Sequence, residues 1–374
     1  MKTQVLKENL KRALSIVERA TAKTPTLPVL GCIALVAQKN SLELSATDLE
    51  LAIRYRVLAK TEQEGGVAVP ARLFSQFAAL LEEREVRLAN GDAGLRVESK
   101  DHQTSIKTMP LDDFPIIPTL QGTEEPVEID AKELCDALSR VVGMAGQNQA
   151  RPEISGVLAV IGKEEIRLVA TDSFRLAEKI LNLGKAQGTE ASVILPQKTA
   201  RELAAILGEA EGRAKLYLSP TQILVGYSSK EAGGDSFELV SRLIEGDYPQ
   251  YQDVIPRDFK AKAVVSRADL VSRVRSASVF SGKMQDVKVV ADAKKKGLEI
   301  SSESSEVGKH SSFLGAEVTG ERLEISFNWR FLLEGLSNMR GEEVEIGFAG
   351  EDAPAVIRPR GKEQYLYVVM PVKA

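Results

Sequence analysis

The sequence repeats itself, and this repetition constrains the fold more than any single motif does. Glu43-Leu-Ser-Ala-Thr-Asp-Leu-Glu-Leu-Ala52 returns as Arg167-Leu-Val-Ala-Thr-Asp-Ser-Phe-Arg-Leu-Ala177. The two Ala-Thr-Asp triplets begin at Ala46 and Ala170, which are 124 residues apart (170 − 46). Gly297-Leu-Glu-Ile-Ser-Ser-Glu303 is a weaker third copy, in which Ser301 is matched to Ala170. The chain is therefore expected to contain three copies of one domain.

The length and the composition agree with several globular domains. A chain of 374 residues is too long for one hydrophobic core and suggests roughly two to three domains. Hydrophobic residues make up 43% and charged residues 27%, as in ordinary globular proteins. No leader-like segment or membrane-length apolar run is found. Cys32 and Cys135 lie in apolar surroundings, which favours two small buried residues over a disulfide. We expect a cytoplasmic protein.

Each third of the chain has the same order of helices and strands. Apolar residues at helical spacing predict a helix over 6–17. A second helix is predicted over 72–81, shortly after Pro70, because a proline is common at the start of a helix. Strands are expected at 33–36, 42–45, 53–58, 86–88 and 95–98. The corresponding helices are 131–142 and 198–207 in the second third, and 267–280 and 329–339 in the last. Pro70 and Pro196 lie 126 residues apart (196 − 70), close to the offset of the triplets.

The predicted fold class is α+β, with two helices packed on antiparallel sheets in each of three tandem domains. Segments rich in proline, glycine and charge predict linkers near Thr119–Pro126 and Pro256–Lys262. The expected domains are residues 1–121, 127–252 and 258–374.

The polar faces of the six helices carry cations with acidic residues between them. One interpretation is a solvated face of mixed charge. The other is a concave surface of six similar helices that contacts duplex phosphates without reading bases, because this needs only long cationic side chains. Aromatic residues are only 5% of the chain, which argues against stacking on single strands. The formal net charge of −4 does not report how the charges are distributed.

Five short motifs, in this order along the chain, resemble one family. They are Thr26-Leu-Pro-Val-Leu30, Thr47-Asp-Leu-Glu50, Val67-Ala-Val-Pro-Ala-Arg72, Val169-Ala-Thr-Asp-Ser-Phe-Arg-Leu176 and Tyr367-Val-Val-Met-Pro371. The family is that of the bacterial sliding clamps, the beta subunits of DNA polymerase III. The resemblance covers the whole chain and implies the DNA clamp fold.

The resemblance also implies an assembly and a function. Two chains would form a head-to-tail homodimer, a ring of six domains around duplex DNA, which is bound independently of sequence. Such a clamp tethers the replicative polymerase alpha subunit, together with other polymerases and repair proteins that carry clamp-binding peptides, and it is placed on DNA by a clamp-loader ATPase. The family is not catalytic, so no catalytic residue, cofactor or metal is expected, and no membrane partner.

The resemblance places a pocket for partner peptides where the second and third repeats meet. Its residues are mostly apolar, as expected for a groove that takes leucine and phenylalanine anchors. Two positions depart from the common pattern, since Ser173 stands where glycine is frequent and Phe174 where histidine is frequent. The implied pocket residues are Ile154, Thr171, Ser173, Phe174, Arg175, Leu176, Pro249, Val254, Asn328, Phe331, Pro354, Val368, Val369, Met370, Pro371 and Val372.

The resemblance further implies DNA contacts and a subunit junction. At the DNA-contact positions, Thr24 stands where arginine is frequent, next to Lys23. The implied DNA-contact residues are Lys23, Thr24, Arg72, Gln147, Arg151 and Lys198. At the junction, Val279 and Phe280 of one chain are expected to pack near Ile106 of the other.

Two other classes of function compete with this interpretation. An enzyme could pair Asp48 with Asp172 and use His102 or His310 as a base. However, the duplicated Thr-Asp occurs at equivalent places in separate domains, where a structural turn explains both copies. A scaffold that binds peptides without encircling DNA is the second alternative, and retention on circular duplex DNA would distinguish it from a clamp.

Overall fold

The computed structural model describes residues 1–25, 27–91, 93–119, 125–147, 150–186, 188–208, 210–229 and 235–372. Thr26 and most of the predicted linker at 119–126 lie outside the described residues. Within these ranges there are six α-helices, two in each third: α1 (Lys7–Val17), α2 (Ala71–Leu80), α3 (Ala131–Val141), α4 (Gln197–Leu207), α5 (Arg267–Ser278) and α6 (Trp329–Ser337). None of them is long and apolar enough to cross a membrane.

Each of the three repeats has eight or nine strands among the described residues. The first repeat has β1 (Lys2–Leu6), β2 (Cys32–Gln38), β3 (Ser41–Thr47), β4 (Leu51–Gln63), β5 (Gly65–Pro70), β6 (Glu85–Gly91), β7 (Gly94–Glu98) and β8 (Gln103–Ile106). The second has β9 (Val127–Asp130), β10 (Gly156–Ile161), β11 (Glu165–Thr171), β12 (Arg175–Asn182), β13 (Ala191–Pro196), β14 (Arg213–Leu218), β15 (Gln222–Ser228) and β16 (Ser236–Arg242). The third has β17 (Ala261–Ser266), β18 (Asp286–Asp292), β19 (Gly297–Ser304), β20 (Gly308–Gly315), β21 (Glu317–Gly320), β22 (Leu323–Asn328), β23 (Glu343–Phe348), β24 (Ala355–Pro359) and β25 (Tyr365–Val369).

The first helix of each repeat buries the same three positions, which explains why the helices can be read from sequence. Apolar side chains at the fourth, eighth and eleventh positions form one stripe that packs on the sheet. These residues are Leu10, Leu14 and Val17 in α1, Leu134, Leu138 and Val141 in α3, and Leu270, Val274 and Ala277 in α5. The helix starts are fixed locally, since Ser266 accepts a hydrogen bond from the Asp269 amide and Asn328 accepts one from the Arg330 amide.

Both helices predicted in the third repeat are shorter in the structure, and α6 ends at Ser337 instead of Met339. The helix predicted over 267–280 ends at Ser278, so Phe280 lies in the turn after α5. The hydroxyls of Ser276 and Ser278 donate to main-chain carbonyls of the preceding turn, at 3.1 and 2.8 Å, a local bonding pattern that disfavours continuing the helix.

The third copy of the repeated motif is shifted by one residue from the predicted alignment. On β19, the side chains of Leu298 and Ile300 are buried in the core. The next buried side chain on this strand is Ser302, not Ser301. Ser302 therefore corresponds to Ala170 at an offset of 132 residues (302 − 170). Because side chains alternate between the two faces of a strand, a shift by one residue would have placed the polar face inward. The turn that follows, 305–307, contains no Thr-Asp pair.

The chain forms two compact units, and the second repeat is divided between them. Unit 1 comprises Met1–Asp136, Leu183–Ala191 and Arg201–Leu243, and unit 2 comprises Ala137–Asn182, Ser192–Ala200 and Ile244–Ala374. The division follows the sheets. In unit 1, β16 pairs antiparallel with β4, so that the sheet runs from β8 at one edge to β9 at the other. In unit 2, β12 pairs antiparallel with β25 in a sheet that runs from β13 to β21.

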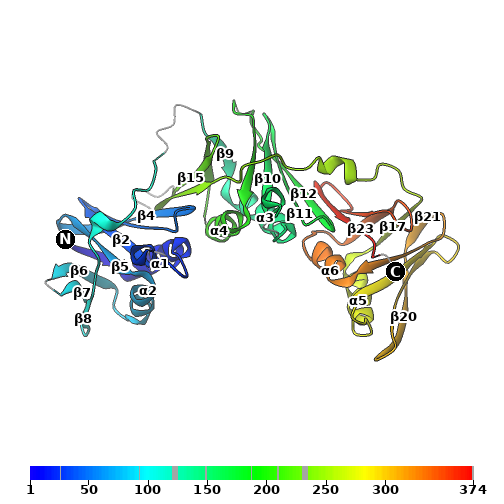
Figure 1. Cartoon of the computed structure of the whole chain (residues 1–374), viewed down its shortest axis with the longest axis horizontal. Coiled ribbons are helices and arrows are strands. Elements are labelled where there is room, and N and C mark those ends of the chain that lie inside the picture. Colours follow the sequence, from blue (N-terminus) through cyan, green and yellow to red (C-terminus); the bar gives the residue numbers. More distant parts are fainter. Residues whose placement is uncertain are drawn as a thin grey trace. The chain divides into compact units, whose positions relative to one another are not determined.

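Helices cover the sheets within each unit (Figure 1). In unit 1, α1 packs on β3 and β4 and lies beside α2. In unit 2, α5 packs on β17 to β20 and lies beside α6. The strands β18, β19, β20 and β22 form a separate four-stranded sheet with β20 at one edge. Both cysteines, Cys32 and Cys135, are free thiols.

Candidate functional site

The repeated Thr-Asp forms a turn in which each side chain satisfies main-chain groups. The hydroxyl of Thr171 donates to the Arg175 carbonyl at 2.7 Å and accepts from the Ser173 amide at 3.1 Å. Asp172 Oδ1 accepts from the amides of Phe174 and Arg175, at 2.9 and 3.0 Å. Ser173 has a positive φ of 76°, a conformation that only glycine adopts without strain. The turn joins β11 to β12 and holds Phe174 out into solvent, 62% exposed.

The first repeat contains the same turn, which confirms that the motif is structural. Thr47 donates to the Leu51 carbonyl and accepts from the amide of Leu49, both at 3.0 Å. Asp48 Oδ1 accepts from the amides of Glu50 and Leu51, at 3.0 and 2.8 Å. Leu49 has a φ of 78°, matching Ser173. In the second repeat only, the turn is followed by an arginine, and that residue organises the surroundings.

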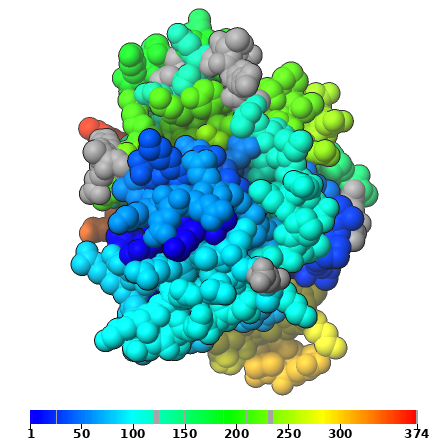
Figure 2. Space-filling model, turned by 90° about the vertical axis from the view of Figure 1, so that its left-hand side faces the viewer, coloured from blue at the N-terminus to red at the C-terminus, as the bar shows by residue number. Residues whose placement is uncertain are grey.

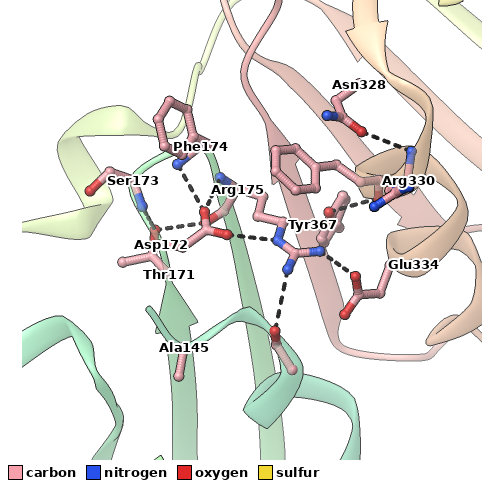
Figure 3. Close-up of polar contacts among 12 residues, drawn as sticks. Ala145, Thr171, Asp172, Ser173, Phe174, Arg175, Asn328, Arg330, Glu334 and Tyr367 are labelled. Atoms are coloured by element: carbon pink, nitrogen blue, oxygen red, sulfur yellow. Dashed lines mark hydrogen bonds and ion pairs between the residues drawn. The ribbon is translucent and has the colours of Figure 1, made fainter. Parts of the chain in front are cut away.

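Arg175 is enclosed by partners on several sides (Figure 3). Its Nε donates to Asp172 Oδ2 at 2.9 Å, and its Nη1 lies 2.5 Å from Glu334 Oε2 of α6. The guanidinium also lies over the ring of Phe331, 4.4 Å from the ring centroid, a cation–π contact. Burial by itself would lower the pKa of Arg175, but the hydrogen bonds to Glu334 and Asp172 raise it above its ordinary value. Arg175 thus fixes the turn against α6.

Close packing of α6 on β25 brings Glu334 to this position. Gly335 leaves no room for a side chain, since a Cβ there would lie 2.3 Å from the ring of Tyr367. The Tyr367 hydroxyl donates to the Phe331 carbonyl at 2.8 Å, and burial raises the pKa of Tyr367. Sequence reasoning did not identify Glu334. The sequence signal for Glu334 is that it is the sixth residue of α6, as Glu202 is the sixth residue of α4.

Met370, which follows β25, lies beside the same turn. The amide of Met370 donates to the Phe174 carbonyl at 2.9 Å, and the amide of Val372 donates to the Ser326 carbonyl at 2.8 Å. The exposed side chains of Phe174, Val254 and Met370 are large and apolar. Their chain neighbours Leu176, Ile255 and Val368 belong to, or pack against, a core cluster that includes residues of β10, β11, β12, β24 and β25. Exposed apolar side chains above a well-formed core are typical of an interaction surface.

The other predicted pocket residues are distributed between this surface and the core. Ile154 and Thr171 are both bonded through their carbonyls to the Gly146 amide, at 2.9 and 3.2 Å. The predicted pocket residues that are fully buried are Ile154, Leu176, Val368 and Val369. Those that are half-buried are Thr171, Arg175, Pro249, Asn328, Phe331, Pro354, Pro371 and Val372.

The predicted DNA-contact residues are all exposed: Lys23, Thr24, Arg72, Gln147, Arg151 and Lys198. Arg151 is paired with Glu153 at 3.1 Å. Arg72 and Lys198 are the second residues of α2 and α4, and the second residue of α6 is the exposed Arg330. A cation at the same helical position of all three repeats adds Arg330 to the candidates, which alignment of the three helices in the sequence could have shown.

The predicted junction residues differ in burial. Val279 is 67% exposed, whereas Ile106 is 3% exposed because β8 packs it within its own repeat. Phe280 is half-buried and stacks on the ring of His310, with the ring centroids 5.4 Å apart. Ile106 lies on β8 and His310 on β20, and both strands are sheet edges.

Three tandem repeats of paired helices on antiparallel sheets, with exposed apolar side chains at the end of the last strand, define a protein of the clamp fold. Models of the DNA polymerase III beta subunit match the N-terminal domain at residues 1–118, the central domain at 128–250 and the C-terminal domain at 252–373. The beta sliding clamp of Synechococcus elongatus is 29% identical over all of this chain and 99% of its own length, and that of Bacillus subtilis 25% over all of both.

Solved structures of sliding clamps are also similar to this chain. The chain superimposes on the sliding clamp of Bacillus subtilis with a TM-score of 0.92 at 25% identity, covering 100% of this chain and 99% of the other. The Pseudomonas aeruginosa clamp bound to griselimycin gives a TM-score of 0.92 at 26% identity, with complete coverage of both chains. The chain belongs to the DNA polymerase III beta subunit family, and its function is that of a sliding clamp, a processivity factor of DNA replication.

Replacing Arg175 with alanine is expected to loosen the turn and lower stability. Removing one member of a largely buried charge cluster leaves Asp172 and Glu334 without their partner, a loss of about 2 kcal/mol. We expect the thermal midpoint of Arg175→Ala to fall by about 5 °C. Arg175→Lys keeps the charge but not the planar donors, and it should recover only part of this loss. Equal midpoints for the wild type and Arg175→Ala would show that the cluster does not stabilise the fold.

Proposed function

We propose that two copies of this chain close head-to-tail into a ring around duplex DNA, and that the ring is a non-catalytic tether for replication and repair proteins. The proposal rests chiefly on one observation, that successive repeats join by the same antiparallel strand pairing. The fourth strand of the first repeat, β4, pairs with β16, and the corresponding strand β12 pairs with β25. The strands left over by this pattern are β20, the fourth strand of the third repeat, and β8, the last strand of the first repeat. Each of them is the edge of its sheet within the described chain.

The exposed face of α2, which belongs to the same repeat as β8, supports the same conclusion. Leu73 and Leu80 of α2 are 53% and 74% exposed, whereas their counterparts in α4, Thr199 and Ile206, are 2% and 4% exposed. An apolar stripe of this kind on a single helix is typical of a surface that another chain covers. Figure 2 views the molecule from the side of this repeat, and its cyan surface is formed by the last strands of the repeat and by the segment that follows β8. A heterologous contact between edges closes into a ring when its rotation permits.

DNA contact is assigned to the cations at the second position of α2, α4 and α6. Long cationic side chains at equivalent positions of similar helices would meet phosphates around a duplex without reading its sequence. The partners proposed for the apolar surface near Phe174 and Met370 are the replicative polymerase alpha subunit, the clamp loader and other proteins with clamp-binding peptides. We place the protein in the cytoplasm, with domains at 1–121, 127–252 and 258–374.

The competing classes of function receive less support. A peptide scaffold without encirclement would leave the edges of β8 and β20 unexplained, and the family does not favour it. For an enzyme, the two aspartates would need to be available, but Asp48 and Asp172 are each bonded within their own turn. The described residues contain no group of three or more histidine, cysteine, aspartate or glutamate side chains placed to hold a metal.

The substitution Phe280→Arg tests the proposed junction. The wild-type chain should have twice its chain mass by light scattering at micromolar concentration. Phe280→Arg places a charge without a partner among buried groups and should yield monomers, because burying an unpaired charge costs several kcal/mol. Leu58→Arg, on a half-exposed position of β4, is the matched control and should remain dimeric. A dimeric Phe280→Arg variant would contradict the assignment of this residue to the junction.

A further inference from the structure

A pocket of about 150 Å³ lies in unit 1, between the sheet of the first repeat and the segment that follows β8. Strands β2, β3 and β4 form one side of it, and the segment 111–117 forms the other. This segment is part of the cyan surface in Figure 2. The lining includes Ala34, Val36, Ser45, Arg54, Phe114 and Ile117.

The strands of the second repeat carry larger side chains at the equivalent positions. Ala34 and Ser45 are opposite each other on β2 and β3. Their equivalents 124 residues later (158 − 34 and 169 − 45) are Leu158 and Val169, which are also opposite each other. Leu158 and Val169 are buried in one core cluster with Tyr251. The first repeat therefore has less side-chain volume on this face of its sheet.

The segment that covers the sheet shows a third difference of the same kind. Ile117 lies two residues after Pro115, as Tyr251 lies two residues after Pro249. Each is buried in the core cluster of its own repeat, with Ile117 8% and Tyr251 7% exposed. An isoleucine side chain is smaller than a tyrosine ring. The pocket thus corresponds to space that aromatic and larger aliphatic groups fill in the second repeat.

The charged residue at the pocket is already neutralised. Arg54 takes the strand position of Glu178 (178 − 54 = 124), to which the Tyr251 hydroxyl donates at 2.6 Å in the second repeat. The Arg54 Nη1 lies 3.1 Å from a carboxylate oxygen of Glu238, and its Nη2 donates to the Ile117 carbonyl. Because Arg54 is paired, the pocket favours a neutral occupant over an ion that would have to give up its hydration.

Ser45 supplies a polar group that has no partner within the described part of the chain. Its side chain is 7% exposed and lines the pocket, and its hydroxyl forms no hydrogen bond there. Buried hydroxyls are usually hydrogen-bonded, because leaving one unpaired is unfavourable. A hydroxyl can both donate and accept, so a neutral group with a hydroxyl of its own would satisfy Ser45.

We propose that this pocket receives a tyrosine side chain of a partner protein. A cavity of this volume accommodates a benzene-sized ring, and the phenol hydroxyl would share a hydrogen bond with Ser45. Ile116, the neighbour of Ile117, is 96% exposed, and Pro118 is also exposed. This apolar rim favours a protein chain over a free phenol, because a chain would cover it.

The proposed anchor site goes beyond the ring and beyond the surface near Phe174. All residues that line the pocket belong to unit 1, whereas Phe174 belongs to unit 2. The tyrosine site therefore does not depend on ring closure or on the peptide surface. A monomer mass by light scattering would contradict the ring and leave this site standing.

The test follows assigned methyl groups of the full-length protein by NMR while p-cresol, the tyrosine side chain, is added. We expect saturable shifts at Val36 and Ile117, with a dissociation constant on the order of 5 mM for so small a ligand. Toluene lacks the hydroxyl and should bind about fivefold more weakly, the effect of one neutral hydrogen bond. N-acetyl-tyrosine amide should bind at least as tightly as p-cresol, since a partner must deliver the ring from a main chain.

Two variants tie the shifts to the pocket. Ala34→Leu introduces the residue that the second repeat has at this position, and it should abolish the shifts by filling the space. Ser45→Ala keeps the space and should reduce the affinity for p-cresol to that for toluene. Ser41→Ala is the matched control, because Ser41 lies on the same face of β3, four residues earlier and outside the lining. It should bind p-cresol as the wild type does.

Three results would overturn the proposal. The first is the absence of saturable shifts at Val36 and Ile117 in the wild type. The second is equal affinity for p-cresol and toluene, or for p-cresol in the wild type and Ser45→Ala, which would exclude a role for the hydroxyl. The third is binding of p-cresol without binding of N-acetyl-tyrosine amide, which would assign the pocket to a free phenol. Ser45→Ala keeps the test decisive if Ala34→Leu does not fold.

Discussion

Loaded rings are expected to remain on nicked circular duplex DNA at a salt concentration that abolishes binding to linear duplex of the same length. Binding through phosphate contacts alone falls steeply with salt, because it is driven by counterion release. A chain of net charge −4, with acidic residues between its cations, can make few such contacts. A closed ring needs none to stay on a circle. We expect its half-life on the circle to exceed that on the linear form by more than about tenfold at moderate salt.

The measurement follows labelled protein that co-elutes with DNA before and after the circle is cut. Cutting should release the ring quickly. Replacing Arg72, Lys198 and Arg330 by alanine should impair loading more than retention, because we propose that the three cations position the duplex and do not hold it. Neutralising the exposed lysines 294–296 is the matched control, and it should change neither loading nor retention. Equal loss from the linear and circular forms would contradict encirclement.

Deleting the chain from Met370 onward is expected to abolish binding of short peptides of the Gln-Leu-x-Leu-Phe type. The deletion removes the exposed Met370 side chain and the hydrogen bond that joins its amide to the Phe174 carbonyl. Loss of a central anchor and its support should weaken binding by more than about thirtyfold. Titration calorimetry measures the affinity, and light scattering should still report a dimer.

Two further variants are compared with this deletion. Deleting only the last two residues retains the bond from the Val372 amide to the Ser326 carbonyl, and it should leave the affinity unchanged. Phe174→His should change the affinity modestly, because the turn that presents the side chain is held by Thr171 and Asp172. Unchanged affinity after the longer deletion would rule out the proposed surface.

Local patterns in the sequence determined the repeats, the helices and the Thr-Asp turn. Helices α1 to α6 could be predicted because apolar residues recur at the spacing of one helix face, and because prolines and caps mark where helices begin. The turn could be predicted because Thr47 and Asp48 bond to main-chain groups no more than four residues away. The pocket and junction residues came from resemblance to the family, and their roles remain predictions.

Contacts between distant parts of the chain were decided only by the tertiary structure. Arg175 and Glu334 are 159 residues apart in sequence, and Asp235 meets Arg12 across 223 residues. The division of the second repeat between two sheets and the one-residue shift at Ser302 also depend on which strands pair. A charged residue on a polar face has the same local pattern whether it is solvated or paired. Its partner is fixed by strand register between repeats, and no periodicity within a single segment records that register.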